Sequence, residues 1–297
     1  MQGVPTLFAL ATVTFFIMRI APGGPFSGNR QLPKAILENM KRSFHLDEPI
    51  WQQFARFLWN ALQFDFGPSM MYRDYSVARL IVDGATVSME IGLAAMLVAT
   101  VVGVGLGTAG AVRRNTSVDY ACGFVAVIGL AVPIFVIGPL LQLVVGLQWK
   151  LLPIAGWDGT WRYKVLPIIV LALPNIGYIA RLMRGSMIEV LRADYIRTAR
   201  AKGLGARLVL WRHAFGSAIL PVVAYLGPAT AITVTGSVVI EQVFQIPGIG
   251  RYFVTGAINR DYTLVMGVTL FYGTIIIVAN ALTDIVQALL DPRIRHE

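Results

Sequence analysis

The residues that most often carry enzyme chemistry are few and widely separated in this sequence. The histidines are His45, His213 and His296, and the single cysteine is Cys122. The sequence contains neither the H-E-x-x-H arrangement of zinc proteases nor the G-x-S-x-G turn of serine hydrolases. We therefore expect no catalytic residue and no metal site in this chain, and we interpret Cys122 as a small apolar side chain in a helix.

The sequence also lacks a phosphate-binding loop. In the pattern G-x-x-x-x-G-K-[ST] a lysine follows a glycine directly, so that backbone amides and the ammonium group hold phosphate together. No lysine in this sequence follows a glycine, and the chain is therefore expected to bind no cofactor and to hydrolyse no ATP itself. The lysines are Lys34, Lys41, Lys150, Lys164 and Lys202.

The densest group of charged side chains lies at 181–212, where eight basic and two acidic residues give a net charge of +6. Gly203 can end or redirect a helix within this segment. Four apolar residues after it recur with helical spacing, while Arg207, Arg212 and His213 lie on other faces. A short helix of this kind can lie on anionic lipid or dock in a groove of another protein. The apolar face consists of Leu204, Leu208, Trp211 and Phe215.

The chain that contains this basic segment has the composition of a membrane protein. Of the 297 residues, 56% are hydrophobic and 14% are charged, whereas about 25% are charged in a typical soluble domain. Six runs lack Asp, Glu, Lys and Arg, and a spanning helix needs roughly 20 apolar residues. The runs are 1–18, 91–112, 120–149, 165–180, 213–240 and 262–283.

We therefore expect an all-α integral membrane protein with six transmembrane helices. The first run has no basic residues before it and no A-x-A cleavage site, so it is interpreted as a retained helix at 1–20. A sizeable outer loop region follows at 21–85, and a five-helix core occupies 86–290. The core helices are expected at about 86–111, 118–148, 165–184, 216–241 and 264–290.

Basic residues predict the orientation of these helices, because short loops rich in Lys and Arg stay in the cytoplasm. The segment at 181–212, the loop with Arg113 and Arg114, and the tail at 291–297 fall on one side if six helices alternate. Both termini are therefore expected in the cytoplasm. Residues 21–85, 149–164 and 242–261 are expected on the opposite side.

Three motifs stand in and just after the basic segment: "TARAKG" (198–203), "LWRHAF" (210–215) and "AILP" (218–221). They resemble the cytoplasmic EAA loop of ABC importer permeases of the peptide and nickel transport family, in particular its oligopeptide branch. Arg197, Thr198 and Ala199 stand at the EAA positions, and the gap from Gly203 to Pro221 is longer than in other importers, as in the peptide subfamily. Further matching motifs are "MRIAPGGPF" (18–26), "FDFGPSMMYRDYSV" (64–77), "RGSMIEVL" (184–191), "GSVVIEQVFQIPGIGRYFVTGAINRDYTLVMG" (236–267) and "DPRI" (291–294).

The resemblance implies a type I ABC importer permease core in the inner (cytoplasmic) membrane of a bacterium. It implies four kinds of contact: a second permease subunit, two ABC ATPase subunits that bind ATP and Mg, an extracytoplasmic peptide-binding protein, and membrane lipid. No nucleic acid is expected. The implied function is oligopeptide import coupled to ATP hydrolysis by the partners. Dipeptide or nickel import, and an ion-coupled carrier or channel, are the alternatives.

In that family the EAA loop carries a helix that sits in a cleft of the ATPase, which corresponds here to the loop at 192–215. This coupling loop would pass the closure of the ATPase pair to the flanking membrane helices. The residues expected to take part are Arg197, Thr198, Ala199, Lys202, Gly203, Leu204, Arg207, Leu208, Trp211 and His213.

A second candidate segment is "QIPGIGRYFVTGAINRDY" (245–262), which is unusually apolar for an exposed loop. Irregular backbone at membrane depth is tolerated only where protein buries it or where it lines a cavity. We expect a re-entrant element at the outer mouth that contacts the binding protein or gates the pore; a plain interhelical turn is the alternative. Its candidate residues are Pro247, Gly248, Gly250, Arg260 and Asp261.

An ion-coupled carrier would need ionisable groups within the membrane. Each candidate lies at or near the edge of an apolar run, which favours an interface or partner contact over a proton relay. The candidates are Arg19, Glu90, Glu241 and Asp284.

Overall fold

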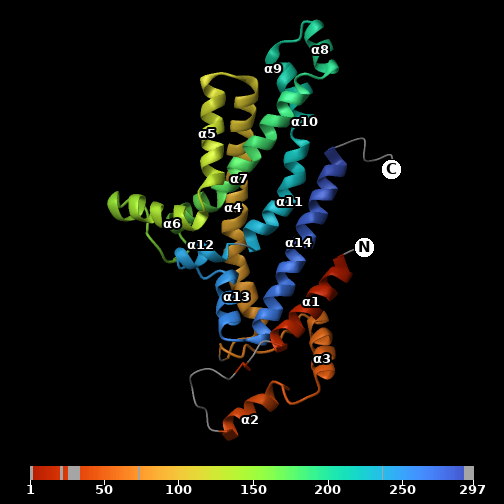
Figure 1. Cartoon of the computed structure of the whole chain (residues 1–297), viewed down its shortest axis with the longest axis vertical. Helices are drawn as coiled ribbons and strands as arrows, with labels where there is room; N and C mark the ends of the chain where they lie inside the picture. The colour runs from red at the N-terminus through yellow and green to blue at the C-terminus, as the bar shows by residue number, and fades with distance from the viewer. Residues whose placement is uncertain (1–2, 21–22, 26–33, 73, 236, 291–297) are drawn as a thin grey trace. The chain divides into compact units, whose positions relative to one another are not determined.

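A computed structural model describes residues 3–20, 23–25, 34–72, 74–235 and 237–290. These residues form helices joined by turns, with no β-strand in the described part of the chain (Figure 1). They divide into two compact units. The first unit is Met1–Ser88 with Pro247–Ile277, and the second is Met89–Ile246 with Val278–Glu297. The expected cytoplasmic tail at 291–297 lies outside the described residues.

Within the described ranges, five helical segments are long and apolar enough to cross a membrane. The longest, α4, has 36 residues and is about 54 Å long at 1.5 Å per residue, well above the roughly 30 Å hydrocarbon core of a bilayer. It must therefore extend beyond the membrane. The five segments are α1 (Gly3–Ile20), α4 (Val77–Val112), α7 (Trp161–Val190), α11 (Leu220–Thr235) with α12 (Val238–Val243), and α14 (Tyr262–Leu290).

The single helix expected at 118–148 is broken in the structure. It is divided into α5 (Ser117–Ala131) and α6 (Ile134–Leu141), and α6 continues as the π-helix η1 (Gln142–Gln148). The two parts are bent by 102°. The break is at Val132 and Pro133, whose ψ angles of 122° and 137° are extended. Proline has no N–H to donate and excludes the residue before it from the helical region, which explains the break.

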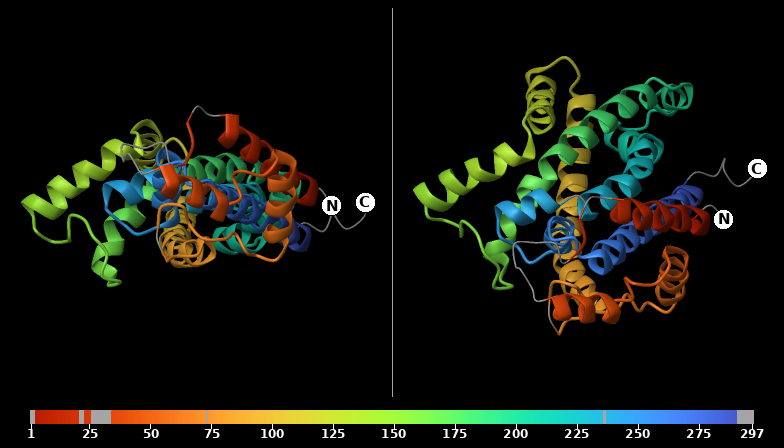
Figure 2. Two further views of the ribbon diagram at one scale, coloured as in Figure 1. Left: turned by 90° about the horizontal axis from the view of Figure 1, so that it is seen from below. Right: turned by 60° about the horizontal axis from the view of Figure 1, so that its bottom comes forward.

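In the first unit, α13 (Ile249–Ile258) packs against the beginning of α4 (Figure 2). A Cβ added at Gly84 would lie 2.9 Å from the Cα and N of Ile249, so only glycine permits this approach. The helices α2 (Lys34–Ser43) and α3 (Ile50–Leu62) belong to the same unit, and Phe15 of α1 packs on Phe54 of α3 with ring centroids 5.0 Å apart. The buried core of this unit consists of Val77, Leu80, Ile81, Ala85, Ile249, Leu264 and Val268.

In the second unit, α4 packs closely against α7. The small residues Gly103 and Gly107 face this contact, as small residues at membrane helix interfaces commonly do. A Cβ at Gly103 would lie 2.8 Å from the Ile179 side chain, and one at Gly107 would lie 2.7 Å from the Cβ of Met183. The close approach of these two helices therefore depends on a G-x-x-x-G pair.

Candidate functional sites

The coupling loop begins with a short helix that ends at Gly203. This helix, α8 (Asp194–Ala201), follows α7 directly in the chain (Figure 1). The N–H of Gly203 donates to the carbonyl of Arg200 at 2.9 Å, and the N–H of Leu204 donates to that of Ala199 at 3.4 Å. Gly203 has φ +81°. This is the paired closing pattern of a helix with a left-handed glycine, so the expected turn at Gly203 is present.

The chain then re-enters a helix that exposes two large apolar side chains. The helical path runs through α9 (Ala206–Leu208), the π-helix η2 (Val209–Ala214) and α10 (Phe215–Ala218). Leu208 is 46% exposed and Trp211 is 55% exposed, while Val209 and Ala214 are buried on the other side. The Trp211 ring lies 5.0 Å from that of Phe215. The apolar face expected from spacing is therefore present and is largely uncovered within this chain.

The other residues of the coupling loop differ in whether a separate protein could contact them. Arg197 forms a surface ion pair with Asp194 at 3.2 Å, and the Thr198 hydroxyl donates to the Asp194 carbonyl at 3.0 Å. Ala199 is buried. Among the residues expected to couple, Ala199 therefore packs inside its own chain and cannot touch a separate protein in this conformation. Lys202 and Arg207 are exposed, and Leu204 and His213 are half-buried.

The segment at 245–262 contains the helix α13 and is therefore more than an interhelical turn. Gly248 and Gly250 are buried and Pro247 is half-buried. The N–H of Ile249 donates to the Ser88 hydroxyl at 2.9 Å, which satisfies one amide at the start of the helix. Burial, followed by the nearby Tyr72, raises the pKa of Tyr252 on the same helix.

Asp261, expected at the outer mouth, is 0% exposed and cannot contact a binding protein in this conformation. Its Oδ1 accepts from the N–H of Leu264 at 3.0 Å and from the Thr263 hydroxyl at 2.9 Å, which caps α14. Its Oδ2 accepts from the Ser69 hydroxyl at 2.5 Å and from the Met71 N–H at 3.1 Å. The carboxylate thus ties the loop before α4 to the start of α14.

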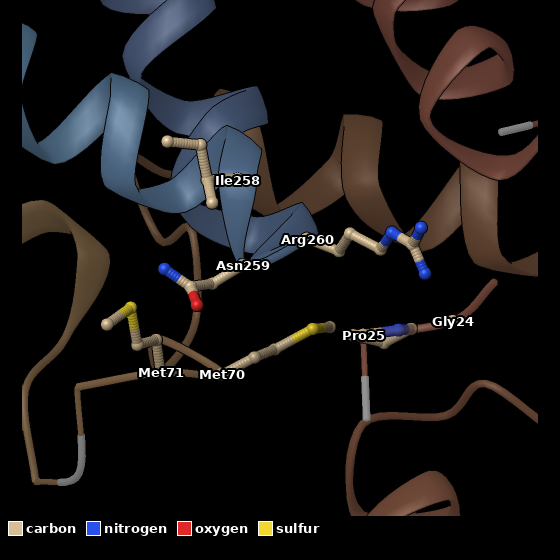
Figure 3. Close-up of a pocket in the computed structure, with 7 residues that line it drawn as sticks. All are labelled: Gly24, Pro25, Met70, Met71, Ile258, Asn259 and Arg260. Carbon is tan, nitrogen blue, oxygen red and sulfur yellow. The ribbon is translucent and has the colours of Figure 1, made fainter. Parts of the chain in front are cut away.

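Arg260 lines a cavity of about 420 Å³ in the first unit (Figure 3). Its φ of +57° is left-handed, and it occupies the position after α13 where a glycine is most common. The N–H of Arg260 donates to the Ala257 carbonyl at 3.3 Å. The cavity is lined by Gly24, Pro25, Met70, Met71, Ile258, Asn259 and Arg260.

Three of the four ionisable candidates have partners within the chain. The Arg19 guanidinium lies 3.5 Å above the Phe15 ring and donates to Gln53 at 2.9 Å. Glu90 pairs with Lys164, and Glu241 accepts from the Ser237 hydroxyl at 2.5 Å. These contacts agree with structural roles, as expected from the position of each residue near the edge of an apolar run.

Known proteins are similar to this chain over nearly its whole length. The chain is 45% identical over 297 residues to the oligopeptide transport system permease protein OppB of Salmonella typhimurium, covering 100% of this chain and 97% of that protein. It is 44% identical to OppB of Escherichia coli strain K12 with the same coverage. It is 41% identical over 290 residues to the dipeptide transport system permease protein DppB of Bacillus subtilis, covering 98% and 94%.

Two solved structures share the fold at low sequence identity. An inward-facing MetNI methionine ABC transporter matches with a TM-score of 0.57 and 15% identity, covering 71% of this chain and 96% of that chain. An amino acid ABC transporter crystallised with histidines matches with a TM-score of 0.53 and 14% identity, covering 72% and 94%. The model of one family, described as the binding-protein-dependent transport system inner membrane component, matches residues 99–296. With its several apolar spans, this multi-pass membrane protein belongs to that family of ABC transporter permeases.

Proposed function

We propose that this chain is a permease subunit of an ABC importer that moves oligopeptides across the inner membrane. The observation that carries this proposal is the 45% identity to an oligopeptide permease along the full 297 residues. In this proposal the chain hydrolyses no ATP. Two partner ATPases bind ATP and Mg, a second permease completes the pore, and an external binding protein delivers the peptide.

The coupling loop supplies the ATPase contact in this proposal. Leu208 and Trp211 are uncovered and lie one helical turn apart, which suits the i, i+3 anchors of a helix seated in a groove. Lys202 and Arg207 are exposed nearby and would meet acidic or polar groups at the groove's rim. In this proposal the coupling loop and both termini lie in the cytoplasm.

Fewer residues are candidates for contact with the binding protein than the sequence analysis proposes. Arg260 and the cavity that it lines are the candidate contact for the binding protein, because Arg260 is partly exposed. Asp261 acts indirectly, by holding the loop that carries Met70 and Met71 in place.

The docking role can be tested with two substitutions in the same helical stretch. Leu208→Asp puts a charge on the apolar face, whereas Ala206→Asp puts the same charge on an exposed neighbour outside that face. The tagged complex is purified from its native membrane in mild detergent, and the retained proteins are identified by mass spectrometry. We expect the wild type and Ala206→Asp to retain an ATPase and a second permease, and Leu208→Asp to lose the ATPase.

Retention of the ATPase by Leu208→Asp at the wild-type level would contradict docking through this face. Recovery of the wild-type chain alone, as a homo-oligomer, would instead contradict the importer and favour a carrier or channel.

Dipeptides are a second candidate substrate, because the relative from Bacillus subtilis at 41% identity is a dipeptide transport permease. Competition of unlabelled dipeptides against a labelled oligopeptide, measured with the complete importer, separates the two. Competition that grows with peptide length favours oligopeptides, and stronger competition by dipeptides favours the second candidate.

A further inference from the structure

A cluster of uncharged polar side chains joins α7 to α11 in the middle of two spanning helices. Tyr225 donates its hydroxyl to Oδ1 of Asn175 at 2.9 Å. Nδ2 of Asn175 donates to the Thr233 hydroxyl and to the Leu171 carbonyl, both at 3.2 Å. Asn175 lies halfway along the helix α7.

Polar groups of this kind often serve only to bind membrane helices together. A purely adhesive cluster is packed on all sides, but this one borders a cavity of about 210 Å³. Asn175 and Tyr225 are half-buried, and Ile232 on the rim is 66% exposed. The cavity is lined by Ile134, Leu171, Pro174, Asn175, Tyr225, Ala229, Ile232 and Thr233.

The cluster retains hydrogen-bonding capacity that its internal contacts do not use. Both protons on Nδ2 of Asn175 are engaged, but Oδ1 has a second lone pair and the Tyr225 oxygen can accept as well as donate. The Tyr178 ring stacks on Tyr225 with centroids 4.3 Å apart, which fixes the phenol beside the cavity. The site thus offers acceptors to a ligand with N–H groups, and the side chains that line it carry no charge.

We propose that Asn175 and Tyr225 form a binding site for the main chain of a peptide in transit. This inference rests on the proposed function and assigns one step of it to named residues. Main-chain N–H groups recur along every peptide, so acceptors that read only these groups accept any sequence. The absence of charge in the lining means that acidic and basic side chains are neither attracted nor repelled at this point.

Access to the site can be measured by cysteine labelling of the assembled complex in proteoliposomes. Cys122 is first changed to alanine. Ile232→Cys then places a thiol on the rim of the cavity, and Trp161→Cys places one outside it, at the first residue of α7; the two positions are 66% and 68% exposed. A charged methanethiosulfonate reagent is applied with and without excess oligopeptide while ATPase turnover is running.

We expect the reagent to modify Ile232→Cys, and oligopeptide to slow that modification severalfold while leaving the rate at Trp161→Cys unchanged. Failure of the reagent to reach Ile232→Cys during turnover, or equal rates with and without peptide, would overturn the inference. Peptide uptake measured in the same vesicles separates failure of this site from failure of the proposed function. If the wild type takes up peptide but peptide does not slow the modification of Ile232→Cys, only the binding site is contradicted. If the wild type shows no ATP-dependent uptake, the proposed function itself is contradicted.

Tyr225→Phe tests the hydrogen bond itself, because it removes one oxygen and keeps the aromatic stack. Loss of one hydrogen bond is expected to raise KM for uptake about three- to tenfold. The rise should be the same for alanine, lysine and glutamate oligopeptides of equal length. A merely structural role would lower the yield of assembled complex and the maximal uptake rate instead of raising KM, and an effect confined to one peptide charge would contradict main-chain recognition.

Discussion

Asp119 and Arg184 form a two-pronged ion pair between α5 and α7. The Nε and Nη2 atoms of Arg184 donate to Oδ1 and Oδ2 of Asp119 at 2.6 and 2.7 Å. The carboxylate is 5% exposed and also accepts from the N–H of Asn115 at 2.9 Å. Because α7 leads directly into the coupling loop, this pair fixes the end of the helix through which ATPase movement would pass.

The first prediction concerns removal of the arginine. Arg184→Met would leave the buried Asp119 carboxylate with only the Asn115 amide, and breaking a buried pair in this way typically costs about 3–5 kcal/mol. We expect a clear drop in the thermal unfolding temperature of the detergent-purified protein. Arg181→Met is the matched control, since Arg181 is exposed one turn earlier on the same helix. Equal stability of the two variants would contradict a structural role for the pair.

The second prediction concerns the cap of α14. Asp261→Ala would remove the acceptor of four hydrogen bonds, one of them from the buried N–H of Leu264, and a hydrogen bond to a charged group contributes about 1.5–3 kcal/mol. We expect strong destabilisation and faster proteolysis of the loop at 67–76. Asp65→Ala is the control, because that carboxylate accepts from the exposed Gly67 amide. Similar proteolysis of the two variants would show that the cap is dispensable.

The third prediction concerns the turn in the coupling loop. Gly203 has φ +81°, where a residue with a Cβ is disfavoured by about 1–2 kcal/mol. A Cβ built there meets nothing within 4 Å, so the penalty comes from the backbone and not from bulk. Gly203→Ala and Gly203→Leu should therefore impair peptide uptake per ATP hydrolysed to a similar degree.

Gly205 provides the control for this turn. Its φ is −63° and its surroundings are equally open, so Gly205→Ala should behave as wild type in the same uptake and ATPase assays. A much larger effect of Gly203→Leu than of Gly203→Ala would indicate a steric clash with a partner and contradict the backbone explanation.

The fourth prediction concerns the approach of α13 to α4. Gly84→Ala would force the backbone of Ile249 to move, and such overpacking typically costs about 1–3 kcal/mol. We expect a lower unfolding temperature and a change in the exposure of the segment at 245–262 to hydrogen exchange. Gly105→Ala in the same helix, where a Cβ meets open space, should have little effect. Unchanged exchange in Gly84→Ala would contradict the tight contact.

The spans were predictable because they depend on local composition, and the turn at Gly203 was predictable because one residue type dominates such turns. The break at Pro133 was missed because the apolar run continues across it, and hydropathy does not register a lost backbone donor. The burial of Asp261 is not readable from the sequence, because it depends on Ser69, 192 positions away in the chain. Asn175 and Tyr225 were not linked for the same reason, since nothing local in an apolar run indicates which helix faces meet.

The measurement that tests the central claim most directly is oligopeptide uptake by the complete importer in proteoliposomes. This chain is reconstituted with its partner permease, the ATPases and the binding protein, and labelled peptide is followed across the membrane. We predict accumulation that requires hydrolysable ATP and the binding protein and that is unaffected by collapsing ion gradients. Accumulation driven by an ion gradient without ATP, or no accumulation of any oligopeptide, would contradict the assignment of this chain as an ATP-driven peptide permease.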